Sequence, residues 1–239
     1  MGYIQDENLN FLKYCDNNDL DILVKYLTED KNGTSRLTET LTISDGYKKY
    51  YPNHKKYWTD IAAELQTFGG NTFMNILRLG DGVKYKEILI DVCKKMKVNF
   101  NENSSVITIE NNLMCKVLED SIKNLSEEEI KELMKELKFN TTNFTKQGVT
   151  LAIQALIKQG GFMSYQILVI VANAVAKQIL GHGLKFATNS ALTKTMSILI
   201  GPIGWAITSI WTIIDIAGPA YRVTIPACIQ IYDMGRKIT

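Results

Sequence analysis

The stretch that decides the fold is Thr195 to Ile214, which reads TMSILIGPIGWAITSIWTII and contains no charged residue. As one helix it would span roughly 30 Å, at about 1.5 Å per residue. Gly201-Pro202 interrupts it, because proline lacks a backbone N–H and clashes with the preceding turn of a helix. Proline is tolerated in the first turn of a helix, so we expect two apolar helices that meet at Gly201-Pro202.

Three interpretations of these apolar helices are open. They could form the core of a soluble helical bundle, or a hairpin from Leu192 to Ala217 that opens onto a membrane, or a permanent integral hairpin. Trp205 and Trp211 suit interfacial anchors, although tryptophan also packs inside bundles. Asp215 argues against simple lipid exposure, because a charge in the middle of a bilayer is costly.

Charge divides the chain unevenly. The whole chain has 27 basic and 25 acidic residues, but from Thr141 onward there are eight basic and only two acidic ones. The apolar back part is therefore basic and the polar front part is slightly acidic. Basic side chains on apolar helices suit an anionic lipid surface, so we expect Lys185, Lys194 and Arg222 to face lipid headgroups. The alternative is a buried helical layer that simply contains few acids.

Proline is absent from Asn53 to Gly201, and apolar residues recur there at helical spacing. This pattern predicts an all-α protein. We expect a helical bundle with a polar N-terminal helical module and an apolar, glycine-punctuated C-terminal helical module. The predicted divisions are a helical hairpin in 1–33, a helical middle region in 34–140 and the apolar basic module in 141–239.

Local signals predict individual helices. Val83 to Val98 and Val106 to Asn124 have amphipathic spacing. Ser126 and Glu129 form a capping box at the start of the next helix. We expect a helix that begins at Asn53 to end at Gly69-Gly70, an irregular link before Asn53, a cap at Ser164, and a final helix or extended tail.

No catalytic motif is present, so we predict no enzyme, no catalytic residue, no cofactor and no metal site. Asp60 and Glu64 share a helix face by their spacing of four, and His54 lies six residues before Asp60. A metal-dependent hydrolase built on these three residues is a third alternative, and it would need them to converge, because metal sites usually have three or four ligands. His182, the only other histidine, lies in a distant glycine turn.

The four cysteines are widely spaced and form no C-x-x-C pair, which is typical of buried free thiols in a reducing compartment. The polar N-terminus predicts a cytoplasmic location, peripheral or inserted at the inner membrane. Gly46 to Trp58 mixes four lysines with four tyrosines, and base stacking or headgroup contact could use that mixture. We favour a solvated link whose aromatic rings pack on the first helices. A net charge of +2 is too small to support nucleic-acid binding.

Five segments together resemble the bacterial YaaW family. They are NNDLDILVKYLTEDKNG (Asn17 to Gly33), RLTETLT (Arg36 to Thr42), YPNHKKYWTDIAAELQTFGGNTF (Tyr51 to Phe73), YKEILIDVCKKMKVN (Tyr85 to Asn99) and GPIGWAITSIWTIIDIAGPAYRVTIPA (Gly201 to Ala227). Some classifications group that family distantly with ubiquinol–cytochrome c chaperones. The resemblance implies an all-α domain that binds a partner protein at a membrane, and it brings no catalytic residue.

The expected function is that of a non-enzymatic, membrane-associating helical protein, with a membrane-perturbing or pore-forming effector as its active form. The expected hairpin tip and anchors are Gly201, Pro202, Gly204, Trp205 and Trp211. The alternative is a soluble helical chaperone or assembly factor with a groove in Val83 to Phe139. The expected partners are inner-leaflet lipid, a protein, or both, and the oligomeric state is open.

Overall fold

The fold is all-α in the computed structural model, as predicted. The structure describes residues 2–30, 32–73, 82–123, 125–136, 145–180, 218 and 220–238. Within these ranges every regular element is a helix, and the only extended pairing is one isolated bridge between Glu29 and Ser35. The chain therefore buries its apolar surface by packing helix against helix.

The helices fall into two sets along the chain. The first set is η1 (Asn10–Tyr14), α1 (Asn17–Thr28), η2 (Leu41–Ile43), α2 (Asp45–Tyr50), η3 (His54–Tyr57) and α3 (Trp58–Phe73), where η marks a 3₁₀ helix. The second set is α4 (Tyr85–Lys95), α5 (Val106–Lys123), α6 (Glu127–Glu136), α7 (Lys146–Gln159), α8 (Gly161–Leu180) and α11 (Tyr221–Ile238).

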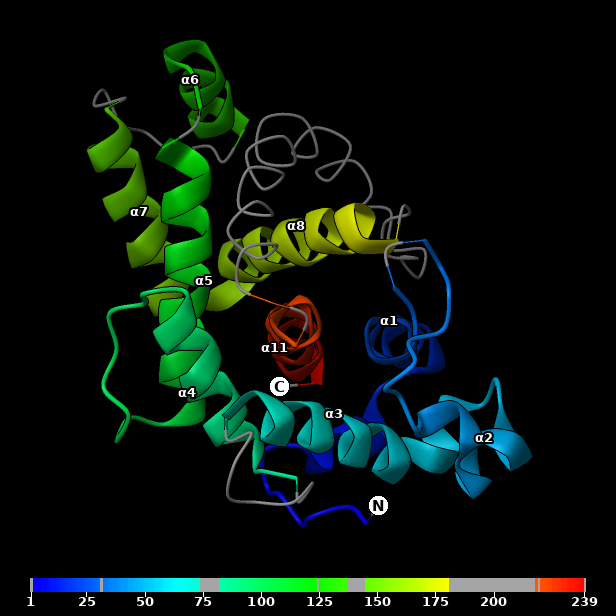
Figure 1. The fold of residues 1–239 in the computed structure, drawn as a ribbon. Helices are drawn as coiled ribbons and strands as arrows, with labels where there is room; N and C mark the ends of the chain where they lie inside the picture. Colours follow the sequence, from blue (N-terminus) through cyan, green and yellow to red (C-terminus); the bar gives the residue numbers. More distant parts are fainter. Residues whose placement is uncertain are drawn as a thin grey trace.

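The C-terminal helix α11 lies at the centre of the fold (Figure 1). It packs against α1, α3, α4, α5 and α8, and every residue from Val223 to Met234 is buried. A helix that is buried over this length must be surrounded by other helices. Of the two predictions for this segment, a helix is correct and an extended tail is wrong.

Of the two helices in the predicted N-terminal hairpin, only the second is an α-helix. The Asp16 side chain accepts a hydrogen bond from the Asp19 N–H at 3.0 Å and so caps α1. The segment before it is the short 3₁₀ helix η1, which ends at Tyr14. Only five residues lie in that turn, too few to form the repeated i to i−4 bonds of a stable α-helix.

Gly69-Gly70 does not end α3, which continues to Phe73, so that prediction is wrong. A Cβ atom on Gly69 would lie 2.3 Å from Cγ1 of Ile88 in α4. The glycine therefore permits two helices to cross closely, and it is not a stop signal. Glycine has low helix propensity, and packing against α4 offsets that cost so that α3 continues past Gly69.

The segment before Asn53 is also more ordered than an irregular link. It contains η2 and α2, and Ser44 caps α2 by accepting a hydrogen bond from the Tyr47 N–H at 3.2 Å. Asn53 makes no side-chain cap, because a 3₁₀ turn from His54 to Tyr57 comes before α3.

In the second half of the chain, more of the local signals agree with the structure. α4 and α5 lie within one to three residues of their predicted limits. The Ser126–Glu129 capping box forms, with distances of 2.7 and 3.2 Å for its two hydrogen bonds. Ser164 caps nothing: α8 begins at Gly161, and the Ser164 hydroxyl is buried with no described partner.

Seven of the eight residues predicted to contact a membrane lie outside the described part of the chain. They are Lys185, Lys194, Gly201, Pro202, Gly204, Trp205 and Trp211. The eighth, Arg222, is exposed in the first turn of α11. The three-part division at 33 and 140 stays a prediction.

Candidate functional site

The lysine- and tyrosine-rich segment from Gly46 to Trp58 packs its rings on the first helices. His54 and Tyr57 are buried, and His54 Nδ1 lies 2.6 Å from the Tyr57 hydroxyl oxygen. His54 Nε2 lies 3.4 Å from Asp21 Oδ1 in α1. The four lysines of the segment are exposed. This is the interpretation that we favoured, although the segment is helical in part.

The pKa of Asp21 is lowered to about 2, first by its hydrogen bond with His54 and then by contact with Lys25, against the opposing effect of burial. Both ring nitrogens of His54 therefore interact with protein groups, Nδ1 with Tyr57 and Nε2 with Asp21. His54 does not join Asp60 and Glu64, each of which has its own partner. Within the described residues, no group of three or more His, Cys, Asp and Glu side chains could hold a metal ion.

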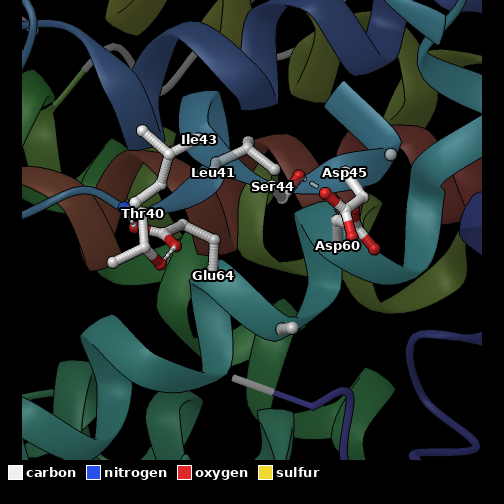
Figure 2. A pocket seen from close by; sticks show the side chains of 9 residues that line it. Thr40, Leu41, Ile43, Ser44, Asp45, Asp60 and Glu64 are labelled. Carbon is white, nitrogen blue, oxygen red and sulfur yellow. Dashed lines mark hydrogen bonds between the residues drawn. The ribbon is translucent and has the colours of Figure 1, made fainter. Parts of the chain in front are cut away.

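A pocket of about 540 Å³ lies between the 40–46 segment and the face of α3 that carries Asp60 and Glu64 (Figure 2). Figure 2 shows its two ends: Thr40 meets Glu64 at one end, and Ser44 meets Asp60 beside Asp45 at the other. The remaining lining residues are Leu41, Ile43, Gly46 and Ala63.

Hydroxyl groups of the 40–46 segment bind the two carboxylates on α3. Glu64 accepts hydrogen bonds from the Thr40 N–H at 3.0 Å and the Thr40 hydroxyl at 2.6 Å. Asp60 accepts one from the Ser44 hydroxyl at 2.8 Å. Burial raises the pKa of Glu64, and the bonds from Thr40 oppose that rise. These contacts fix the acidic floor of the pocket in one arrangement.

The mouth of this pocket is both apolar and acidic. Ile43 is 63% exposed, and Asp45 is exposed beside it. At Gly46, a Cβ atom would lie 2.3 Å from Asp60 Oδ2, so only glycine allows α2 to approach α3 this closely. The shape and charge suit a segment that carries a basic group next to an apolar side chain.

Sequence reasoning found half of this pocket. The spacing of Asp60 and Glu64 correctly placed both on one helix face. The residues opposite them, Thr40, Ile43 and Ser44, were missed because the segment was interpreted as an irregular link. Ser44 before Asp45 was the available signal, since serine before an acidic first turn favours a helix start.

The cysteines offer no nucleophile. All four are free and buried, as the sequence predicted. Burial raises the pKa of Cys15 and of Cys93 to about 12. A reactive cysteine needs a thiolate in an accessible, electropositive setting, and these thiols have neither.

Among the described residues, α8 is the one helix long and apolar enough to cross a membrane. It has 20 residues, and 67% of its apolar window is buried inside the protein. Three polar side chains, Ser164, Gln166 and Asn173, are buried along it. The core helix of a soluble protein has the same length and composition, so α8 is weak evidence for a membrane span.

Two family models match the chain. Residues 3–37 match a domain of unknown function, DUF3944, and residues 53–228 match a family described as ubiquinol-cytochrome C chaperone. A UPF0174 protein of Helicobacter pylori strain J99 is 50% identical over 238 residues, which cover 99% of this chain and 94% of the relative. The UPF0174 protein YaaW of Escherichia coli K12 is 30% identical over 244 residues, which cover 100% of this chain and 98% of the relative.

The all-α fold and the longer family match together place the chain in a class of helical proteins whose family model is described as ubiquinol-cytochrome C chaperone. Within that class, the chain belongs to the bacterial UPF0174 family, and the resemblance to YaaW is confirmed. No solved structure matches the chain.

Proposed function

We propose that this protein is a non-enzymatic, cytoplasmic assembly factor that binds a partner protein. The observation that carries the proposal is the match of residues 53–228 to a family described as ubiquinol-cytochrome C chaperone, a range that includes most of the helical core. This is the alternative that the sequence left open, and it takes precedence over the membrane-perturbing effector. The one described helix that could span a membrane is mostly buried, so an effector draws little support from it.

The pocket at α3 supports partner binding. Its acidic floor is held by Thr40 and Ser44, and its mouth exposes Ile43 next to Asp45. A partner segment with a lysine or arginine beside a large apolar residue would match both features. Burying a side chain the size of Ile43 stabilises a complex by about 1.5–3 kcal/mol before binding costs, so this residue would be a main contributor.

Site-specific photocrosslinking would test this function. A photoreactive phenylalanine analogue replaces Ile43 in the full chain expressed in its own cell type, and the captured protein is identified and purified. Its affinity is then measured with the wild type, with Ile43→Ser and with Asp45→Lys. We expect a discrete complex that each substitution weakens about tenfold, as expected from losing roughly 1.4 kcal/mol.

Leu151 on α7 is the matched control, since it is 59% exposed and lies outside the pocket. Leu151→Ser should leave the affinity unchanged, and an analogue at 151 should not capture the same protein. A complex insensitive to Ile43 and Asp45 would remove the pocket from the proposal. Finding no discrete partner with either analogue would oppose the assembly-factor function itself.

A second candidate function is contact with the inner membrane. It is supported by the length and composition of α8 and by the excess of basic residues after Thr141. In this proposal Gly201, Pro202, Gly204, Trp205 and Trp211 form the tip and anchors of a hairpin, and Lys185, Lys194 and Arg222 contact headgroups. The apolar basic module in 141–239 would then be the membrane-facing part, distinct from the polar modules in 1–33 and 34–140.

Sedimentation with vesicles tests the membrane proposal separately. Vesicles of phosphatidylglycerol and phosphatidylethanolamine should retain the wild type at low salt. Replacing Lys185, Lys194 and Arg222 together by glutamate should release it, because each basic residue near an anionic surface contributes about 1 kcal/mol. Equal retention of both proteins would contradict headgroup contact.

A further inference from the structure

A second pocket lies on another side of the fold, where the start of α5, the end of α11 and the N-terminal segment meet. Its volume is about 350 Å³, at the lower end of the range for small-molecule sites, roughly 300–1,000 Å³. It shares no lining residue with the pocket at α3. Its apolar walls are Phe11, Val106, Ile107, Ile231 and Ile238.

Glu110 supplies a carboxyl group to this pocket from α5. The residue is only 6% exposed, and Oε1 accepts a hydrogen bond from the Tyr85 hydroxyl at 2.7 Å. Within the described residues, the Tyr85 hydroxyl is the one group recorded as donating a hydrogen bond to this carboxyl group. Burial raises the pKa of Glu110 to about 7. Because Glu110 lines the pocket, its carboxyl group can also form a hydrogen bond with a bound ligand.

Arg236 supplies a positive charge to the same pocket from α11. Its guanidinium group makes no ion pair with any described carboxylate, although it lies near enough to lower the pKa of Glu110. Its Nη2 lies 3.3 Å from the point where a Cβ on Gly160 would stand, next to the turn that joins α7 and α8. An arginine guanidinium group can bind a carboxylate through two parallel hydrogen bonds.

The start of α5 adds to the positive field. Ser105 precedes this 18-residue helix, and its hydroxyl accepts a hydrogen bond from the Thr108 N–H at 3.3 Å. The N-terminal end of a helix carries partial positive charge and favours anions. Together with Arg236, this end of α5 makes the polar part of the pocket unfavourable for a cationic group.

We propose that this pocket binds a small amphipathic carboxylate, whose head lies between Arg236 and Glu110 and whose apolar chain lies against Phe11, Ile107 and Ile231. The head accepts hydrogen bonds from the guanidinium group and one from the protonated Glu110 carboxyl. The apolar walls exclude water from the chain. This ligand class satisfies both polar groups at once, whereas an amine would face Arg236 with like charge.

The test uses the full chain and octanoate as the probe, with binding measured by calorimetry at pH 7. We expect saturable binding of one octanoate per chain. Arg236→Gln should weaken it about tenfold or more, because a charge-assisted bidentate pair is lost. Glu110→Gln should keep binding within a factor of about three, since the amide N–H replaces the carboxyl O–H as donor while the amide oxygen accepts from Tyr85.

Lys131→Gln is the matched control, because Lys131 is an exposed basic residue on α6 outside the pocket, and this variant should bind octanoate like the wild type. Thermal unfolding of each variant reports whether the fold is intact. Ile107→Ser, at a wall residue that is 40% exposed, gives a second test that does not depend on Arg236 and should weaken binding severalfold. Octylamine binding as tightly as octanoate, or equal binding by wild type and Arg236→Gln, would overturn the proposal.

Discussion

At the scale of single residues, Glu110 makes stability depend on pH near neutrality. Its folded-state pKa of about 7 lies above the ordinary value, mainly because burial disfavours the charged form. The folded state therefore holds the proton more tightly than the unfolded chain. The contribution to stability is complete below about pH 4.3 and is lost as the pH rises through 7.

Glu110→Gln should flatten this dependence. Urea unfolding of the wild type between pH 4.5 and 8 should show stability falling by up to about 3 kcal/mol from this group, from the size of the shift. Glu64, Asp91 and Asp233 also have raised pKa values and act in the same direction, so the variant should keep a shallower slope. Identical slopes for the two proteins would contradict this account.

Gly69 is a second residue whose effect follows from one contact. In Gly69→Ala the new Cβ would lie 2.3 Å from Ile88 Cγ1, and overpacking of this kind costs about 1–3 kcal/mol. That cost should exceed the gain of roughly 1 kcal/mol from better helix propensity. Gly235→Ala is the control, because its nearest neighbour would be Phe11 Cζ at 3.8 Å. Chemical denaturation should show the first variant less stable and the second unchanged or more stable.

At the scale of elements, the N-cap of α1 can be tested directly. Asp16→Ala removes the acceptor for the Asp19 N–H and should cost about 1 kcal/mol. Asp16→Asn keeps an acceptor of similar capping strength and should change stability by only a few tenths of a kcal/mol. Guanidinium unfolding of the two variants separates the cap from other effects of the substitution. Equal losses would mean that the charge of Asp16, and not its hydrogen bond, stabilises α1.

At the scale of the whole molecule, α11 holds the described helices together. A chain that ends before Tyr221 loses the buried surface between α11 and five other α-helices, and we expect it to show no cooperative unfolding transition. A chain that ends after Lys237 should unfold like the wild type, since Ile238 is 43% exposed and Lys237 keeps its ion pairs with Asp19 and Asp233. Calorimetry of both truncated chains checks this, and a cooperative transition in the first would show that the remaining helices pack without α11.

The sequence by itself determined the fold class and the features set within one or two helical turns. The amphipathic spacing of α4 and α5, the Ser126–Glu129 capping box and the common face of Asp60 and Glu64 were all readable, because each depends on neighbours a few residues apart.

Only the tertiary structure decided which distant residues meet. It placed α11 at the centre and brought Arg236 to the same pocket as Glu110. It also showed that Gly69, where the sequence predicts a helix end, is the point at which α3 crosses α4. It also joined Thr40 and Ser44 to the carboxylates of α3. Periodicity within one helix indicates which face is buried, but it does not indicate which other helix covers that face. That choice is made by the packing of all the helices together.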